Sequence, residues 1–387
     1  MLATAIVRAD AGDPVNFIVG TTLRQEDNLF RLPSDIDPLL LVGKPTKSDQ
    51  VRVAYVGLKL DKSYSQQRFQ LDATATDYRY QTFSQLNFNA REYRGLWMWH
   101  LTQRLRGNVS VEQKQSQANF ADNRNFSGNN TRTTENRRTD ADWWLHGSWH
   151  LTGGVSQYRQ RNSQTFTADD SFKQRSADVG VRYAAESGSS LTLLSRKARG
   201  EYADRVLNAA SLLDTGFNQT DAEVQMTWLL SGESTLNGRL THLERTHEHF
   251  AARDYRGTAG RLDYTWTPTG KLQLKLSAAR DIQSYQEATN SYYVNKGVTF
   301  APLWQIGSKT ALRFSLERSQ RDYLGGASAP SPVARLDHLR SAQLSLDWVP
   351  IRALSLSASL QHDHRDSGNP NLGFEANAVN VAAQLSF

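Results

Sequence analysis

The chain ends on the stretch "NAVNVAAQLSF" (residues 377–387), which gives the clearest local indication of secondary structure. Alternate residues from Val379 through Leu385 to Phe387 are apolar, while the residues between them are small or polar. A period of two indicates a β-strand with one apolar face. Termini of globular proteins usually fray, and a bare edge strand in water promotes aggregation. A strand that includes the last residue therefore needs a neighbouring strand and an apolar environment.

Composition limits the classes of protein that fit. In 387 residues, of which 39% are hydrophobic, no apolar run approaches the roughly 18 residues of a membrane helix. Hydropathy alone would favour a soluble protein, but in a membrane barrel only alternate residues meet lipid. There is no cysteine, which excludes disulfides and thiol chemistry. The net charge of +6 comes from interspersed charges and does not predict nucleic-acid binding.

The same alternation recurs along the chain, as in "GKLQLKLSAARD" (270–281) and "RALSLSASLQHD" (352–363). It predicts an all-β protein without a regular helical period. Eighteen strands are expected at 14–24, 50–61, 64–77, 88–102, 105–117, 132–146, 148–160, 172–185, 189–203, 217–230, 233–247, 253–267, 270–284, 291–304, 308–322, 336–349, 352–364 and 374–387.

The connections between these strands alternate in length. Short turns such as "TPTGK" follow every even-numbered strand, and longer polar links such as 25–49 follow every odd one. Outer-membrane barrels combine an even strand number with short periplasmic turns and long extracellular loops. We therefore predict a single transmembrane antiparallel β-barrel of about 18 strands at 14–387. Residues 1–13 are either the remnant of a signal sequence or a disordered start.

Aromatic residues support the barrel. The nine tryptophans all lie within a few residues of a short turn and are predicted to form a girdle at one membrane interface: Trp97, Trp99, Trp143, Trp144, Trp149, Trp228, Trp266, Trp304 and Trp348. Tyrosines lie nearer the long links and are predicted for the opposite girdle: Tyr80, Tyr93, Tyr158, Tyr202, Tyr255, Tyr285, Tyr292 and Tyr323. A soluble β protein would scatter such residues along its strands.

The final eight residues, "NVAAQLSF" (380–387), resemble the C-terminal insertion signal of bacterial outer-membrane barrels. Ala382 stands where that pattern usually has glycine. The resemblance implies an outer-membrane location, contact with outer-membrane lipid and recognition by the barrel-assembly machinery. It makes Leu385 and Phe387 the insertion-signal residues, with Phe387 on the lipid face near the periplasmic rim.

Several stretches resemble the EpsL-type family of outer-membrane proteins encoded with exopolysaccharide biosynthesis genes in exosortase-bearing (PEP-CTERM) bacteria. "DADWWLHGSWHL" (140–151) and "DYTWTPTGKL" (263–272) are the most distinctive, and "EDNLFRLP" (26–33) is the least specific. The resemblance runs nearly end to end. It implies a part in exporting or assembling an exopolysaccharide together with a periplasmic polysaccharide-export protein, and it brings no catalytic motif.

The face opposite the leucines should line the lumen, and barrels of about 16 to 18 strands can enclose an aqueous channel. Its predicted basic residues are Arg106, Arg182, Arg239, Arg261, Lys275 and Arg313, and its acidic ones are Asp72, Glu112, Asp178, Glu223 and Asp263. Arg196 lies where the alternation is ambiguous and is not assigned. Basic walls favour anions, so an acidic polysaccharide is the expected passenger. The alternative is that these are the ordinary charged walls of a water-filled barrel, paired across strands.

The sequence contains residue types that metal-binding, enzymatic and porin functions would use. "THLERTHEHF" (241–250) contains His242, His247 and His249, but alternation puts His242 on the opposite face, so solvated rim histidines are expected there and at His362 and His364. No metal, cofactor or enzymatic activity is predicted, although paired lumen carboxylates could in principle hydrolyse a glycoside. A diffusion porin remains the main alternative, with the 25–49 link as its candidate constriction. Loop aromatics such as Phe120, Phe126 and Phe166 could stack on sugars, or they could be ordinary loop residues.

Overall fold

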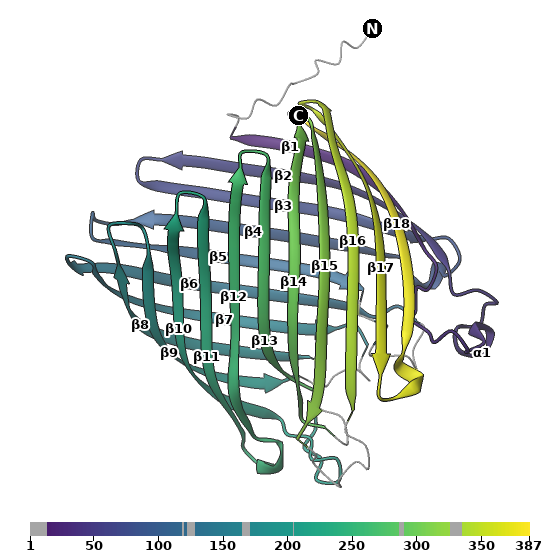
Figure 1. Cartoon of the computed structure of the whole chain (residues 1–387). Helices are drawn as coiled ribbons and strands as arrows, with labels where there is room; N and C mark the ends of the chain where they lie inside the picture. The colour runs from purple at the N-terminus through teal and green to yellow at the C-terminus, as the bar shows by residue number, and fades with distance from the viewer. Residues whose placement is uncertain are drawn as a thin grey trace.

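The computed structural model describes residues 14–117, 120–121, 128–164, 171–203, 205–285, 290–325 and 335–387. The expected start segment 1–13 lies outside these residues, as do Phe126 and Phe166. Eighteen strands form one antiparallel sheet that closes on itself (Figure 1). They are Val15–Glu26 (β1), Asp49–Tyr64 (β2), Gln67–Tyr80 (β3), Phe88–His100 (β4), Leu105–Gln117 (β5), Thr131–His146 (β6), Trp149–Asn162 (β7), Phe172–Ala184 (β8), Ser190–Tyr202 (β9), Gly216–Ser231 (β10), Ser234–His247 (β11), Tyr255–Thr269 (β12), Leu272–Ser284 (β13), Tyr292–Gly307 (β14), Thr310–Leu324 (β15), Leu336–Ile351 (β16), Leu354–Ser367 (β17) and Phe374–Ser386 (β18).

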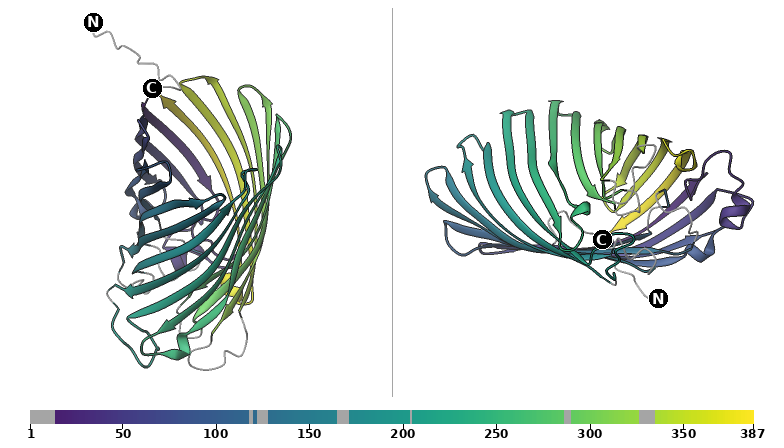
Figure 2. Two further views of the ribbon diagram at one scale, coloured as in Figure 1. Left: turned by 90° about the vertical axis from the view of Figure 1, so that its left-hand side faces the viewer. Right: turned by 90° about the horizontal axis from the view of Figure 1, so that it is seen from below.

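The first and last strands close the barrel. β1 pairs with β18 in a register that places Val19 opposite Leu385, and the backbones of Phe17 and Phe387 exchange two hydrogen bonds of 2.7 and 2.9 Å. Their rings stack with centroids 6.3 Å apart. Seen from below, the strands form an elongated ring (Figure 2, right). Closure leaves no edge strand, which is required in lipid because each unpaired backbone group costs several kcal/mol.

The predicted strand map and the sorting of the links by length are confirmed. Links after even-numbered strands have two to five residues, while links after odd-numbered strands have six or more. The short turns gather at the end that carries both termini, and the long links gather at the other end (Figure 1). By the rule for outer-membrane barrels, the short-turn end faces the periplasm and the long links face outward from the cell.

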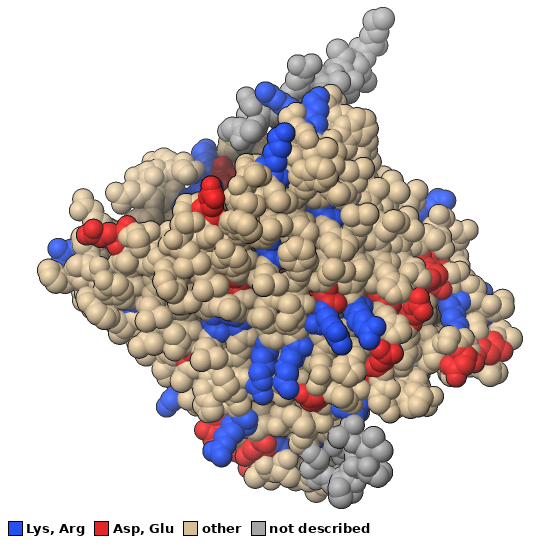
Figure 3. All heavy atoms as spheres, viewed as in Figure 1, with Lys and Arg blue, Asp and Glu red and all other residues tan. Residues whose placement is uncertain are grey.

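The outer face of the barrel is apolar. Val155, Val179, Leu193, Leu240 and Leu360 are all more than half exposed, and all but Leu193 lie near the middle of a strand. An exposed apolar surface that encircles a closed sheet fits hydrocarbon. On the side formed by β10–β18, a belt with few charges crosses the molecule, and Lys and Arg gather in the half nearer the long links (Figure 3).

Tryptophans mark the periplasmic end of this belt. Strand register places eight of them on the outer face, all close to short turns: Trp97, Trp99, Trp143, Trp149, Trp228, Trp266, Trp304 and Trp348. Trp144 follows Trp143 on the same strand and so takes the opposite side, where its indole donates to the Gly147 carbonyl. Leu385 and Phe387 also face outward at this end.

At the outer mouth, three long links share a small hydrophobic core. It consists of Leu29, Phe30, Leu32, Val42, Phe83, Leu86 and Phe120. Arg31 ion-pairs with Asp363 at 3.6 Å, and Arg365, buried on the same inner face of β17, donates to the Ala121 carbonyl. These contacts draw the links over the inner wall, so the mouth is narrowed by three links rather than by 25–49 alone. Phe120 is buried and cannot stack on a sugar.

The short helix α1 (Pro38–Val42) belongs to the first of these links and lies at the rim, outside the strands (Figure 1). Asp37 caps it by accepting a 2.9 Å hydrogen bond from the Leu39 amide. Within the described part of the chain, no helix has the length and apolarity to cross a membrane.

The predicted tyrosine girdle is wrong about the side on which most of the rings lie. Tyr80, Tyr158, Tyr202, Tyr255 and Tyr323 are near the long links, but strand register turns them to the inner face. The reason is the packing beneath the links: Tyr202, Tyr255 and Tyr323 are buried, and the Tyr323 hydroxyl donates to Asp337 at 3.1 Å. The position of a residue in the sequence shows how far along the strand it lies. Whether its side chain faces lipid or the lumen can be determined only from the strand register.

Candidate functional site

Polar side chains line the inner wall, and all six basic residues predicted for the lumen project into it. This follows from register, since their neighbours on either side in the chain face lipid. They do not converge on one point. Arg106 and Arg182 lie near the periplasmic end on β5 and β8, Arg239, Arg261 and Lys275 occupy the consecutive strands β11, β12 and β13, and Arg313 lies on β15.

Arg106 and Arg182 line one recess of about 640 Å³ in the wall formed by β4–β10. Within it, Asp142 accepts from Arg182 at 2.5 Å and lies 2.6 Å from the Nδ1 atom of His150. Arg106 makes no hydrogen bond or ion pair with any residue that the structure describes. Arg138 and Arg196 line the same recess, so it brings four arginines together, and Arg106 is the one of the four that has no ion pair among the described residues.

A second group in this wall is centred on Asp178 of β8. Arg138 of β6 donates two hydrogen bonds to its carboxylate, at 2.7 and 3.0 Å, and Arg196 of β9 approaches at 3.7 Å. Arg138 reaches Asp178 across β7, where Gly154 lies between them. A Cβ atom at Gly154 would lie 2.6 Å from the Arg138 guanidinium, so the pair depends on this glycine.

Arg196 also connects this group to the next strand. Its guanidinium lies 3.8 Å from Asp221 and 3.9 Å from Glu223, and Glu223 in turn accepts from Thr241 at 2.8 Å. The resulting chain of alternating charges runs from Arg138 on β6 to Glu223 on β10, and the Thr241 hydroxyl of β11 donates to its last carboxylate.

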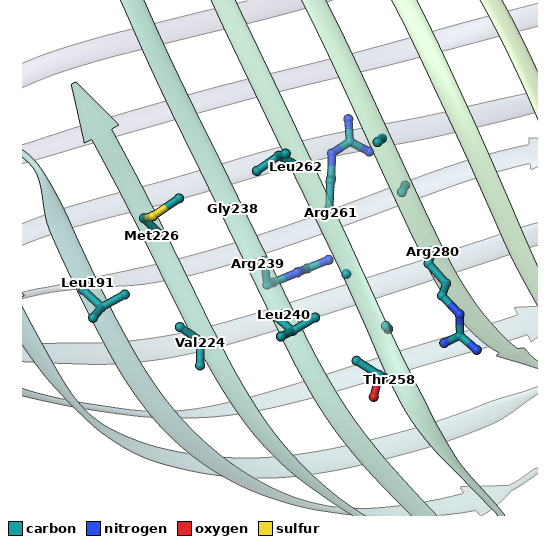
Figure 4. Close-up of a pocket in the computed structure, with 14 residues that line it drawn as sticks. Leu191, Val224, Met226, Gly238, Arg239, Leu240, Thr258, Arg261, Leu262 and Arg280 are labelled. Atoms are coloured by element: carbon teal, nitrogen blue, oxygen red, sulfur yellow. The ribbon is translucent and has the colours of Figure 1, made fainter. Parts of the chain in front are cut away.

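A third group lies on β11–β13. Asp263 accepts from Arg261 at 2.7 Å and lies 3.6 Å from Lys275. Arg239 is directly opposite Arg261 in register and has no hydrogen-bonded or ion-paired partner among the described residues. In Figure 4, Arg239 extends beside the strand that carries Arg261, while Leu240 and Leu262 belong to the outer surface of the same strands. Like charges directly opposite each other repel, so this pair would favour an anion between them.

The remaining predicted wall residues are paired or face a countercharge. Arg313 lies 3.1 Å from Asp347. Asp72 and Glu112 each lie opposite Arg94 in register. The lumen is therefore a mixed surface in which most cations have a carboxylate nearby. Of the six that were predicted, Arg106 lies opposite Asp142 in register but forms no ion pair with a described residue, and Arg239 has no carboxylate in either position.

Sequence analysis missed Arg138 and Arg196, which carry most of the contacts of the Asp178 group. On β6, "TRTTENRRTDAD" (131–142) is polar on both faces above its tryptophans, so alternation cannot assign a side. On β9, the apolar run "LTLL" (191–194) hides the alternation before Arg196. Alternation counted forward from the outward-facing Leu191 would have placed Arg196 on the inner face.

The histidines that the sequence singled out lie on different sides of the barrel wall. His242 faces outward on β11, His247 is buried on the inner face beside Asp254, and His249 lies in the next link, 3.1 Å from Asp214. His362 and His364 occupy the outer face of β17. The expectation of solvated histidines is wrong for His247, because the links cover it. In the ranges that the structure describes, no three His, Asp or Glu side chains are grouped to hold a metal ion.

One His–carboxylate pair, His150 with Asp142, has the arrangement of a catalytic base and its orienting acid. The described contacts of His150 are with Asp142 and Arg182, and no serine hydroxyl is among them. The pair therefore belongs to the charge network of the wall.

Comparison with known proteins agrees with this architecture. The model of the family described as "Putative beta-barrel porin 2" matches residues 253–387, which include β12–β18. A search of curated protein sequences found no match.

Solved structures share the fold. The outer membrane protein OpdK from Pseudomonas aeruginosa is 11% identical and has a TM-score of 0.52, with 96% of this chain and 99% of that chain covered. OccK2 (OpdF) from the same organism, solved in complex with glucuronate, is 13% identical with a TM-score of 0.51, covering 97% of this chain and 98% of that one. With its closed barrel and lipid-facing apolar belt, the chain is a bacterial outer-membrane β-barrel.

Proposed function

We propose that the barrel is a conduit that carries an acidic exopolysaccharide across the outer membrane. The observation that carries the proposal is the inner wall, where cations on many strands are interspersed with carboxylates. Arg106 and Arg239, which have no carboxylate partner among the described residues, are its available anion contacts. Arg182, Arg261, Lys275 and Arg313 add positive charge that nearby carboxylates partly neutralise.

Physical reasoning supports this pattern for a polymer. A passenger must be attracted enough to enter yet held weakly enough at each of several sites to leave. Partly neutralised cations along the wall provide weak, repeated attraction for a chain of carboxylates. The substrate class rests on the resemblance to the EpsL-type family, and the porin description of the matched family model supports transport rather than catalysis.

A second candidate is a channel for small carboxylates. The titles of two structures with this fold record vanillate and glucuronate, both carboxylates, with OpdK and OccK2 respectively. The narrowing of the mouth by three links favours a small solute over a polymer. Because these proteins are at most 13% identical to the chain, their ligands serve here only as the competing hypothesis.

A periplasmic polysaccharide-export protein is the partner that the conduit requires. We propose that it docks at the short-turn end, where links of two to five residues leave the rim accessible. The barrel-assembly machinery would act earlier, through the final strand with Leu385 and Phe387.

Deletion of the gene separates the two candidates. The conduit requires that secreted polysaccharide falls strongly while uptake of small carboxylates is unchanged. Unchanged secretion with lost uptake would overturn the conduit and favour the small-solute channel. Complementation with the unaltered gene controls for effects on neighbouring genes.

A further inference from the structure

A basic patch lies on the outer, lipid-facing side of the barrel, on the opposite surface of the sheet from the lumen. It consists of Arg137 on β6, Arg175 on β8, and Lys197 and Arg199 on β9, all four exposed. Register shows that they face outward: Arg175 shares its face with Val179, and Lys197 shares its face with Leu193. Neither alternation nor the channel function accounts for cations at these positions.

Within the patch, like charges are adjacent. Arg175 lies directly opposite Arg199 in the β8–β9 register, the position at which two like charges repel most strongly. Arg175, Lys197 and Arg199 have no hydrogen bond or ion pair with any described residue. Arg137 has Glu135 at 3.4 Å. Three of the four cations of the patch therefore have no ion-paired carboxylate among the described residues.

The patch borders a recess of about 850 Å³ in the outer surface. Apolar residues on the same face, Val109, Val111, Val155 and Ala177, form the other part of its lining. The recess thus combines charged and hydrocarbon-like walls.

The height of the patch fits the outer headgroup layer. Arg175 is eight residues from Tyr183, which pairs with Trp149 at the periplasmic girdle. At about 3.3 Å per residue and a tilt of about 45°, this is roughly 19 Å, near the top of an apolar band about 25 Å tall. Arg137 lies in the same register row as Arg175, through Gln157 of β7, and Lys197 lies two residues nearer the periplasmic end than Arg199. The long side chain of Lys197 can extend upward to the same level.

From these observations we propose that the patch on β6–β9 binds the phosphate groups of an outer-leaflet lipid headgroup, with acyl chains in the apolar recess beneath. Guanidinium groups bind phosphate through paired hydrogen bonds, and anionic headgroups attract basic clusters at the membrane surface. A phosphate between Arg175 and Arg199 would convert their repulsion into two ion pairs. The inference is independent of what passes through the lumen.

Cations at similar height on another part of the barrel provide a matched comparison. Lys296 on β14 and Arg340 on β16 also face outward and also lie opposite a cation in register, Arg280 and Arg318 respectively. Unlike Arg175 and Arg199, each has a carboxylate nearby, Asp322 at 3.1 Å and Asp366 at 3.7 Å. Because these two cations already have carboxylates, they should contribute little to phosphate binding.

Native mass spectrometry of the detergent-solubilised barrel tests the proposal with lipid A, which carries two phosphates, and with the same lipid after removal of its phosphates. We expect the unaltered protein to retain lipid A at least tenfold better than the dephosphorylated form. R175Q/R199Q should lower lipid A retention at least fivefold, while K296Q/R340Q, with the same change in charge, should stay within twofold of the unaltered protein. Heat-modifiable migration verifies that both variants are folded.

Equal retention of the two lipids by the unaltered protein would overturn the proposal, and this comparison does not depend on either variant folding. Equal losses in the two variants would indicate general surface charge and would also overturn it. Displacement of lipid A by low millimolar inorganic phosphate would show a site for the free ion instead of a lipid. Failure of inorganic phosphate to compete supports the lipid.

Discussion

The guanidinium of Arg138 reaches the carboxylate of Asp178 across an entire strand, with hydrogen bonds of 2.7 and 3.0 Å. The path is open because the intervening residue on β7 is Gly154. Asp178 is nearly inaccessible to solvent, so without Arg138 its charge would depend on Arg196, 3.7 Å away. The charge pattern of this wall therefore depends on one residue without a side chain.

Replacing that glycine should break the pair. G154V places methyl groups where the Arg138 guanidinium lies, which frees Arg138 into the lumen and shifts single-channel conductance and ion selectivity in planar bilayers. The adjacent Gly153 lies opposite the outward-facing Val179 in register and so faces lipid, and G153V is a matched control that should leave both quantities unchanged. Identical recordings from the two variants would contradict the assigned role of Gly154.

The cations without carboxylate partners should dominate anion selectivity. R106Q/R239Q removes two available charges and should move the reversal potential in a salt gradient toward cation selectivity, with little effect on barrel stability. R182Q should act differently, because it leaves Asp142 with His150 as its remaining partner. It should therefore both reduce selectivity and lower the thermal stability of the barrel. A reversal potential that is unchanged in R106Q/R239Q would exclude these two residues as anion contacts.

The long links should respond to acid through Asp214. Burial by itself raises the pKa of this carboxyl, but hydrogen bonds with His249 and from the amides of Thr215 and Phe250 outweigh burial and hold the pKa below its usual value. A lowered folded-state pKa stabilises the folded link above the unfolded pKa of about 3.9, and this stabilisation is lost as the pH falls through the folded value. We expect the link that contains Asp214 to detach from the 248–254 link below about pH 4.

Hydrogen exchange of residues 205–215, corrected for its intrinsic pH dependence, measures this detachment. D214N should show the faster exchange already at pH 7, because an amide cannot replace the carboxylate as a double acceptor. D37N, which alters a carboxylate at the α1 cap in a different link, should leave exchange of 205–215 unchanged. Protection that persists through acid in the unaltered protein would contradict the role of Asp214.

Deletion of the last three residues should impair assembly. Phe387 exchanges two backbone hydrogen bonds with Phe17, and Leu385 pairs with Val19, so the deletion removes contacts that close the barrel as well as the insertion signal. We expect the protein to be made and secreted but to lose heat-modifiable migration in outer-membrane fractions. F387W, which keeps an outward aromatic ring, should assemble normally. Normal migration of the deletion variant would argue against both roles of the last strand.

The parts of the fold that follow from lipid contact could be read from the sequence. Leu272, Leu274 and Leu276 occupy every second position of β13 because one face of this strand meets hydrocarbon. Short and long links alternate along the chain because the two ends of the barrel meet different compartments. The candidate site could be predicted from the sequence less completely. The Arg138–Asp178 contact joins residues 40 positions apart across Gly154, so it depends on the register of three strands. The inward tyrosines likewise depend on links whose packing no local pattern encodes.

Passage of an acidic polymer through the purified barrel tests the central claim most directly. In planar bilayers with the unaltered protein, polyuronate fragments of defined length should produce voltage-dependent current blockades whose duration grows with chain length. Neutral glucans of equal length should produce few blockades, and R106Q/R239Q should shorten those caused by polyuronate. Blockades by a monomeric uronate with none by the longer fragments would contradict the conduit and indicate a channel for small carboxylates.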